Sequence, residues 1–108
     1  GKAIKSKPLY AEVYHNLGKL LGEENIPEKA VASNIKAFLL NPGDYESYTE
    51  IGKWNHLWKN YAFAAALYRF SIMLNPKGGF AEVYLHQANF HHKQMNNNNL
   101  KITLVVLD

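Results

Sequence analysis

The segment Ala11-Glu12-Val13-Tyr14 recurs letter for letter as Ala81-Glu82-Val83-Tyr84, and the related segment Tyr45-Glu46-Ser47-Tyr48 lies between the two copies. The middle segment follows the first by 34 residues, and the same interval separates Pro8, Pro42 and Pro76. The third copy is displaced by two further residues, because the loop around Gly78-Gly79 is longer. A fixed period of this length is typical of proteins built from stacked helix pairs.

Small residues follow the same period and predict helices that pack closely. Gly18 and Gly52 are 34 residues apart, and Ala88 holds the corresponding place in the third copy. The other positions of this kind are Ala30 with Ala64 and Ala37 with Ser71. Because a small side chain lets a neighbouring helix approach, we expect these positions to be buried at helix–helix contacts.

Apolar residues recur at helical spacing and predict helices near 11–24, 28–41, 45–58, 62–75 and 80–95. The first two apolar stripes are Tyr14, Leu17, Leu20 and Leu21, and Ile35, Phe38 and Leu39. Trp54 and Trp58 fall at helical spacing as well, so we expect them in the core between helices rather than on a platform for nucleic-acid bases.

The C-terminal segment gives conflicting signals. Four asparagines at 96–99 predict a loop, and the β-branched residues that follow favour a strand. The register of the repeat instead predicts a second helix over 100–108 that packs back on its neighbour, and we favour the helix. If this helix frays, Tyr84 and Phe90 lose their cover, and we expect the chain to form a homodimer through its C-terminal repeat.

With these features the chain resembles the tetratricopeptide repeat family, whose motif is Trp-x2-Leu-Gly-x2-Tyr followed by Ala, an aromatic residue and Pro. Leu17-Gly18, Ala30 and Pro42 match the motif in the first repeat, with Tyr14 in place of Trp. Asn34 departs from it, because the family has an aromatic residue there and the second repeat has Tyr68.

The resemblance implies an all-α fold, a right-handed superhelix of antiparallel helix pairs with about two complete repeats and partial repeats at both ends. We expect residues 1–108 to form one domain. Its parts are the tail of a preceding repeat (1–10), repeat 1 (11–44), repeat 2 with its loop (45–80) and an incomplete repeat 3 (81–108).

Composition excludes several classes of function. The chain has 108 residues, no Cys and a net charge of +3. Lys2, Lys5 and Lys7 account for that whole excess, so we expect no nucleic-acid partner. No apolar run is long enough to cross a bilayer, and we expect no membrane partner and a cytoplasmic location.

The resemblance also implies that the first helix of each pair lines a concave, peptide-binding groove. The residues expected to face it are Glu12, His15, Asn16, Lys19, Glu46, Thr49, Glu50, Lys53, His56, Glu82, Leu85, His86 and Asn89. Three of its glutamates form an acidic row, and Lys19 with Lys53 forms a basic row. An alternative explanation is that these charges only complement the helix dipoles.

Other ligand classes fit poorly. Some family members clamp a C-terminal carboxylate, but Glu12, Glu50 and Glu82 would repel it here. The five histidines lack the spacing of helical metal ligands, although His56 and His92 occupy equivalent places and could approach each other. We therefore expect no metal, no cofactor and no catalytic residue.

Two hypotheses for function remain. The first is a non-catalytic scaffold that binds a protein or peptide in the groove. The second is the accessory repeat region of a larger bacterial enzyme, similar to a glycosyltransferase or a sulfotransferase, in which the groove recruits the substrate and catalysis lies elsewhere. A catalytic domain in the sequence that follows Asp108 would favour the second hypothesis.

Overall fold

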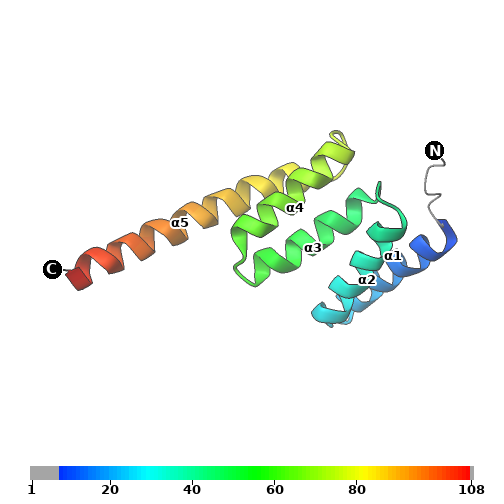
Figure 1. Cartoon of the computed structure of the whole chain (residues 1–108), viewed down its shortest axis with the longest axis horizontal. Helices are drawn as coiled ribbons and strands as arrows, with labels where there is room; N and C mark the ends of the chain where they lie inside the picture. The colour runs from blue at the N-terminus through cyan, green and yellow to red at the C-terminus, as the bar shows by residue number, and fades with distance from the viewer. Residues whose placement is uncertain (1–7, 108) are drawn as a thin grey trace.

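The computed structural model describes residues 8–107, and helices account for nearly all of this range (Figure 1). They are α1 (Pro8–Glu23), α2 (Pro27–Leu40), α3 (Tyr45–Leu57), α4 (Tyr61–Leu74) and α5 (Ala81–Leu107). Residues 8–107 contain no strand, which confirms the predicted all-α class. The basic residues 2–7 and most of the predicted tail 1–10 lie outside the described residues, whereas Pro8–Tyr10 open α1.

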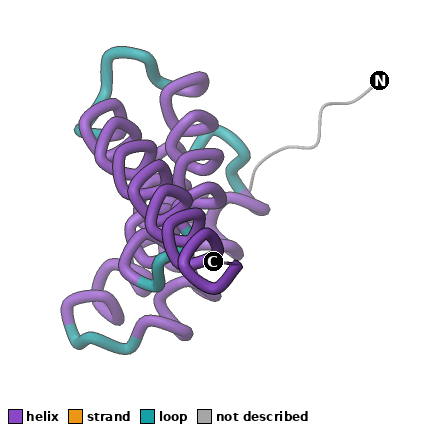
Figure 2. Tube along the Cα trace, turned by 90° about the vertical axis from the view of Figure 1, so that its left-hand side faces the viewer, coloured by secondary structure: helices purple, strands orange, loops and turns teal. Residues whose placement is uncertain are grey.

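The helices form an elongated array of neighbours. α1 packs along α2, α3 along α4, and α4 along α5, while α2 joins the first pair to α3. Short loops reverse the chain at each step, so successive helices are antiparallel (Figures 1 and 2). The radius of gyration is 16.6 Å, against about 13 Å for a compact domain of this length. These contacts are consistent with a helical repeat.

Local signals explain where several helices begin. Pro27 opens α2 at a position where its missing N–H costs nothing. Asp44 caps α3, because its carboxylate accepts a hydrogen bond from the backbone N–H of Ser47 at 3.2 Å. Two tight connections use left-handed backbone, at Asn25 (φ 58°) before α2 and Lys59 (φ 65°) before α4. Lys59 is the more unusual of the two, since Asn tolerates this conformation better.

The predicted small positions are buried at helix contacts. A methyl group added at Gly52 would lie 2.6 Å from the ring of Tyr68 on α4, and one added at Gly18 would collide with the side chain of Asn34 on α2. The alanines and serine at the other small positions are also buried. The prediction that Gly18 and Gly52 lie where the two helices of a pair meet is therefore confirmed.

The prediction for the C-terminal segment was wrong in one respect. No loop forms at 96–99; α5 continues as one helix to Leu107 and projects beyond the other helices (Figure 1). Asn lowers helix stability by at most about 0.7 kcal/mol per residue, and the packed first half of α5 has already nucleated the helix. Without Gly or Pro to stop it, the helix propagates. The segment 100–107 is thus helical, as favoured, but it does not pack back on its own chain.

The predicted core also differs in detail. Trp58 is 40% exposed and Trp54 is half-buried. The two rings stack on each other at a centroid distance of 6.3 Å instead of filling a helix interface. The interfaces take small residues, so the large indoles stay at the surface. Leu20, which belongs to the apolar stripe predicted for α1, is likewise exposed.

Gly52→Ala should destabilise the fold. Overpacking against the ring of Tyr68 costs about 1–3 kcal/mol, which exceeds the gain of about 1 kcal/mol in helix propensity. Gly22→Ala is the matched control, because its methyl group would meet only Trp54 at an ordinary 3.7 Å. Thermal unfolding followed by circular dichroism should show a lower Tm for Gly52→Ala and an equal or higher Tm for Gly22→Ala. Equal stability of the two variants would contradict this description of the helix contact.

Candidate functional site

A cleft of about 630 Å³ lies between α1 and α3, and we call it the α1–α3 cleft. α1 contributes His15, Lys19, Gly22 and Glu23. α3 contributes the opposite wall, and the lining residues there are Glu46, Glu50, Lys53, Trp54 and Leu57. Asn34 reaches the cleft from α2 and is its most buried lining residue, with 3% of its surface exposed.

A smaller hollow of about 210 Å³ lies between α3 and α5, and we call it the α3–α5 hollow. Its walls are α3, the loop 78–80 and Tyr84 at the start of α5. Glu46, Glu50 and Lys53 line both the cleft and the hollow. One face of α3 therefore joins the two depressions into a continuous surface that runs from α1 to α5.

This surface contains six of the residues that the sequence placed in a groove: His15, Lys19, Glu46, Thr49, Glu50 and Lys53. Among them, Thr49 has its hydroxyl engaged inside the fold, 2.6 Å from the hydroxyl of Ser71 on α4. The other predicted groove residues line neither depression: Glu12, Asn16, His56, Glu82, Leu85, His86 and Asn89. Leu85 packs instead against the buried cluster between α4 and α5.

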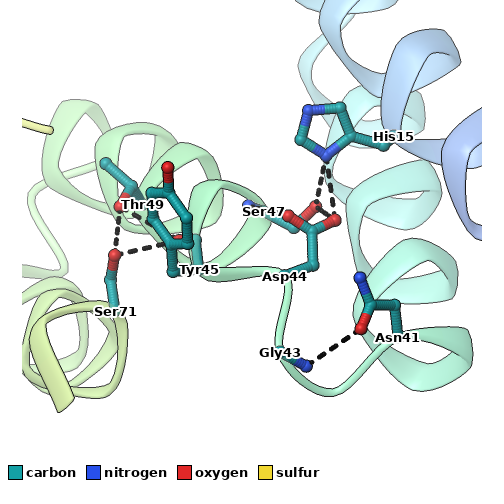
Figure 3. A network of polar contacts seen from close by, with 8 residues as sticks. All are labelled: His15, Asn41, Gly43, Asp44, Tyr45, Ser47, Thr49 and Ser71. Atoms are coloured by element: carbon teal, nitrogen blue, oxygen red, sulfur yellow. Dashed lines mark hydrogen bonds and ion pairs between the residues drawn. The ribbon is translucent and has the colours of Figure 1, made fainter. Parts of the chain in front are cut away.

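A polar network fixes the angle between α1 and α3 at one end of the cleft (Figure 3). Nδ1 of His15 lies 2.8 Å from the carboxylate of Asp44, and the hydroxyl of Ser47 donates to the same carboxylate at 2.6 Å. Because Asp44 also caps α3, one carboxylate connects the start of α3 to the middle of α1. Ser47 is fully buried, whereas the side chains of Asp44 and His15 are 9% and 24% exposed, so this network is partly shielded from water.

A second group of contacts connects α3 to α4. The hydroxyl of Ser71 donates to the backbone carbonyl of Tyr45 at 2.9 Å (Figure 3). Ser71 is one of the predicted small positions, and it combines close packing with a hydrogen bond to the first turn of α3. The wall of the cleft therefore has support on both sides.

The charges on the cleft wall are available to a ligand. Nζ of Lys53 lies 3.3 Å from the carboxylate of Glu50, but both side chains are 43% exposed. Exposed pairs of this kind contribute only about 0.2–1 kcal/mol. Lys53 also lies over the ring of Tyr84, 5.5 Å from its centroid. Both charged groups can thus exchange their partners for a ligand at little cost.

The histidine contact predicted between repeats involves a different residue. Nε2 of His56 lies 2.8 Å from Nδ1 of His91, whereas His92 bonds Asn96 within α5. Burial, and then the charge of His91, lower the pKa of His56 below its ordinary value of 6.5. Residues 8–107 contain no group of three or more side chains that could hold a metal ion.

Sequence reasoning missed several residues of this surface. Asn34 was recognised only as a departure from the repeat motif, and Trp54 was assigned to the core. Tyr84 and the loop 78–80 were not placed in the groove. The departure at Asn34 was a usable signal, because replacing a buried aromatic residue by a short side chain leaves space beside a helix contact.

The chain matches no family model, and no curated protein is significantly similar to it. The geometry of the described residues is therefore the main basis for assigning a function.

Asp44→Ala should lower the free energy of unfolding by more than the loss of a helix cap alone would. The cap alone is worth about 0.5–2 kcal/mol, and the contact with His15 adds to it. A double-mutant cycle with His15→Ala, measured by urea unfolding, should give a coupling of at least about 0.5 kcal/mol. Strictly additive effects would show that the contact between α1 and α3 contributes nothing to stability.

Stability should fall as the pH drops below about 6.5, the ordinary pKa of His56. Because this pKa is lowered in the folded state, the unfolded chain binds more protons below that pH, and the free energy of unfolding decreases with acidity. The decrease should stop below the folded pKa. His56→Gln should reduce the slope of stability against pH just below 6.5, and His86→Gln, a change at an exposed residue, is its control. If the slope is unchanged in His56→Gln, the lowered pKa of His56 is not the cause of the pH dependence.

Proposed function

We propose that the chain is a helical repeat of the tetratricopeptide type that binds an extended segment of a partner protein on the surface between α1 and α5. The observation that carries this proposal is that Glu46, Glu50 and Lys53 line both depressions. A single peptide can therefore contact α1, α3 and α5 without leaving the surface. The antiparallel pairs and the contacts at Gly18 and Gly52 support the resemblance, which implies a right-handed superhelix.

The charges of the α1–α3 cleft favour a peptide over a charged polymer. Two lysines, at positions 19 and 53, and three glutamates, at positions 23, 46 and 50, line it. A surface of mixed sign attracts neither the phosphates of nucleic acid nor a lone carboxylate strongly. A peptide with both acidic and basic side chains satisfies it best.

The proposal assigns binding, and no chemical step, to these residues. In a larger enzyme the same surface would recruit the substrate protein, and a neighbouring domain would carry the chemistry. No helix among the described residues has the length and apolar character to cross a bilayer. The cysteine-free composition fits the cytoplasmic location that we propose.

Binding can be tested with peptides selected from a random phage-displayed library against the immobilised protein. Fluorescence anisotropy would then measure the Kd of the best selected peptide for two variants of equal charge change. Lys53→Glu should weaken binding at least tenfold, because Lys53 lies on both depressions. Arg69→Glu, at an exposed residue of α4 outside the cleft and the hollow, should change the Kd less than twofold. Equal effects of both variants, or no selected peptide, would overturn the proposal.

We also propose that two copies of the chain associate through α5. Its second half exposes several large apolar side chains: Leu100, Ile102, Leu104, Val105, Val106 and Leu107. Leu100 and Leu107 correspond to Ala64 and Ser71, which face the core from α4. In the repeat alignment, the second half of α5 therefore corresponds to the second helix of a pair, which covers the first. The first half of α5 exposes Val83 and Phe90, which such a helix could cover in a second copy.

The symmetric arrangement is a dimer in which each copy covers the first half of the other's α5. Light scattering over a concentration series should show dimers that the triple variant Leu100→Glu, Leu104→Glu, Leu107→Glu converts to monomers. Met73→Glu, at a residue of α4 that is 75% exposed, should leave the dimer unchanged. A parent protein that stays monomeric at several hundred micromolar would refute this association.

A further inference from the structure

The two helix pairs have different side chains at one equivalent position. Tyr68 on α4 and Asn34 on α2 are 34 residues apart, and each lies against the glycine of its partner helix. Tyr68 is 1% exposed and packs with Ala64, Ala65 and Ala88. Its ring lies 5.7 Å from that of Tyr84 on the next helix. In the second pair an aromatic ring therefore fills the space behind the glycine and reaches the following helix.

In the first pair this space is only partly filled. Asn34 occupies the region next to Gly18, but its side chain is too short to extend further toward α3. The cleft beside Asn34 has a volume of about 630 Å³, whereas the hollow beside the second pair has about 210 Å³. The larger cleft thus lies where the repeat would otherwise place an aromatic ring.

Asn34 is 3% exposed, and no other residue between 8 and 107 makes a hydrogen bond with its side chain. Its amide nitrogen and oxygen are still within reach of solvent, because no buried side-chain N or O atom of the described residues lacks a partner. A carboxamide offers both donors and an acceptor, so a ligand that displaces water can bond this amide. Asn34 lines the cleft, so a ligand in the cleft can reach this amide. Trp54 supplies an aromatic wall to the same cleft.

We propose that the α1–α3 cleft takes a tyrosine side chain from the partner peptide. Its ring lies against Trp54, at the place that Tyr68 fills in the second pair, and its hydroxyl bonds the amide of Asn34. A hydroxyl both donates and accepts, and so it matches a carboxamide better than an apolar group does. This inference rests on the proposed peptide-binding function and names the residue that the cleft selects.

The probes are three blocked pentapeptides with the sequence Gly-Gly-X-Gly-Gly, in which X is Tyr, Phe or Leu. Each is titrated into the ¹⁵N-labelled full chain, and the side-chain signals of Asn34 and Trp54 are followed by NMR. The Tyr peptide should shift both signals and bind about fivefold more tightly than the Phe peptide, as expected for one net hydrogen bond. The Leu peptide should bind most weakly, because it lacks the ring.

Variants at Asn34 test separately whether the peptide occupies the cleft and whether it bonds the amide. Asn34→Tyr fills the cleft from within, as Tyr68 does in the second pair, and should abolish binding. Asn16→Tyr, which adds the same side chain on an exposed part of α1 outside the cleft, should leave binding intact. Asn34→Ala keeps the cleft and removes the amide, so it should erase the preference for Tyr over Phe even if Asn34→Tyr does not fold.

The outcomes distinguish this inference from the proposed function. Equal binding of the three peptides, or a preference for Tyr that persists in Asn34→Ala, overturns the tyrosine site. If library-selected peptides respond to Lys53→Glu but contain no Tyr and bind Asn34→Tyr unchanged, only the tyrosine site fails. If no peptide binds the surface at all, both proposals fail.

Discussion

The structure depends on one repeated contact, in which a side chain from the second helix of a pair occupies the space left by a glycine on the first. Gly52 accepts the ring of Tyr68, and Gly18 accepts the amide of Asn34. A larger residue at Gly52 would press on the buried ring of Tyr68, and one at Gly18 would displace the amide of Asn34. The close approach allows alanine and serine to form most of the interface, which explains why the large side chains are left at the surface.

The two helix pairs differ in the side chain that makes this contact. Where the inserted side chain is Tyr68, its ring fills the space beside Gly52 and contacts Tyr84 of α5. Where it is Asn34, the pair stays intact but leaves a cleft with a buried amide on its wall. The same architecture thus gives a filled contact in one pair and an open cleft in the other, which we propose as the ligand site. A binding site of this kind requires no change in the backbone.

The polar contacts hold the walls of that opening in place. Asp44 caps α3 and binds His15 of α1, while Ser71 bonds the first turn of α3 from the other side. Both contacts are partly shielded from water, which makes hydrogen bonds and charge pairs stronger than at the open surface. The exposed charges of Glu50 and Lys53 add little to the fold and are therefore free to contribute to recognition.

Sequence patterns were enough to predict the helices, their order and the positions where they touch, because these follow from short-range periodicity and from the size of Gly18, Gly52 and Ala88. They also placed Lys19, Glu46, Glu50 and Lys53 on one surface. The continuation of α5 through residues 96–99 became clear from the folded arrangement alone, since no local signal shows whether a covering helix has a surface on which to pack. The same arrangement also decided that Trp54 and Asn34 face a cleft: the space beside a side chain depends on helices that are distant in sequence.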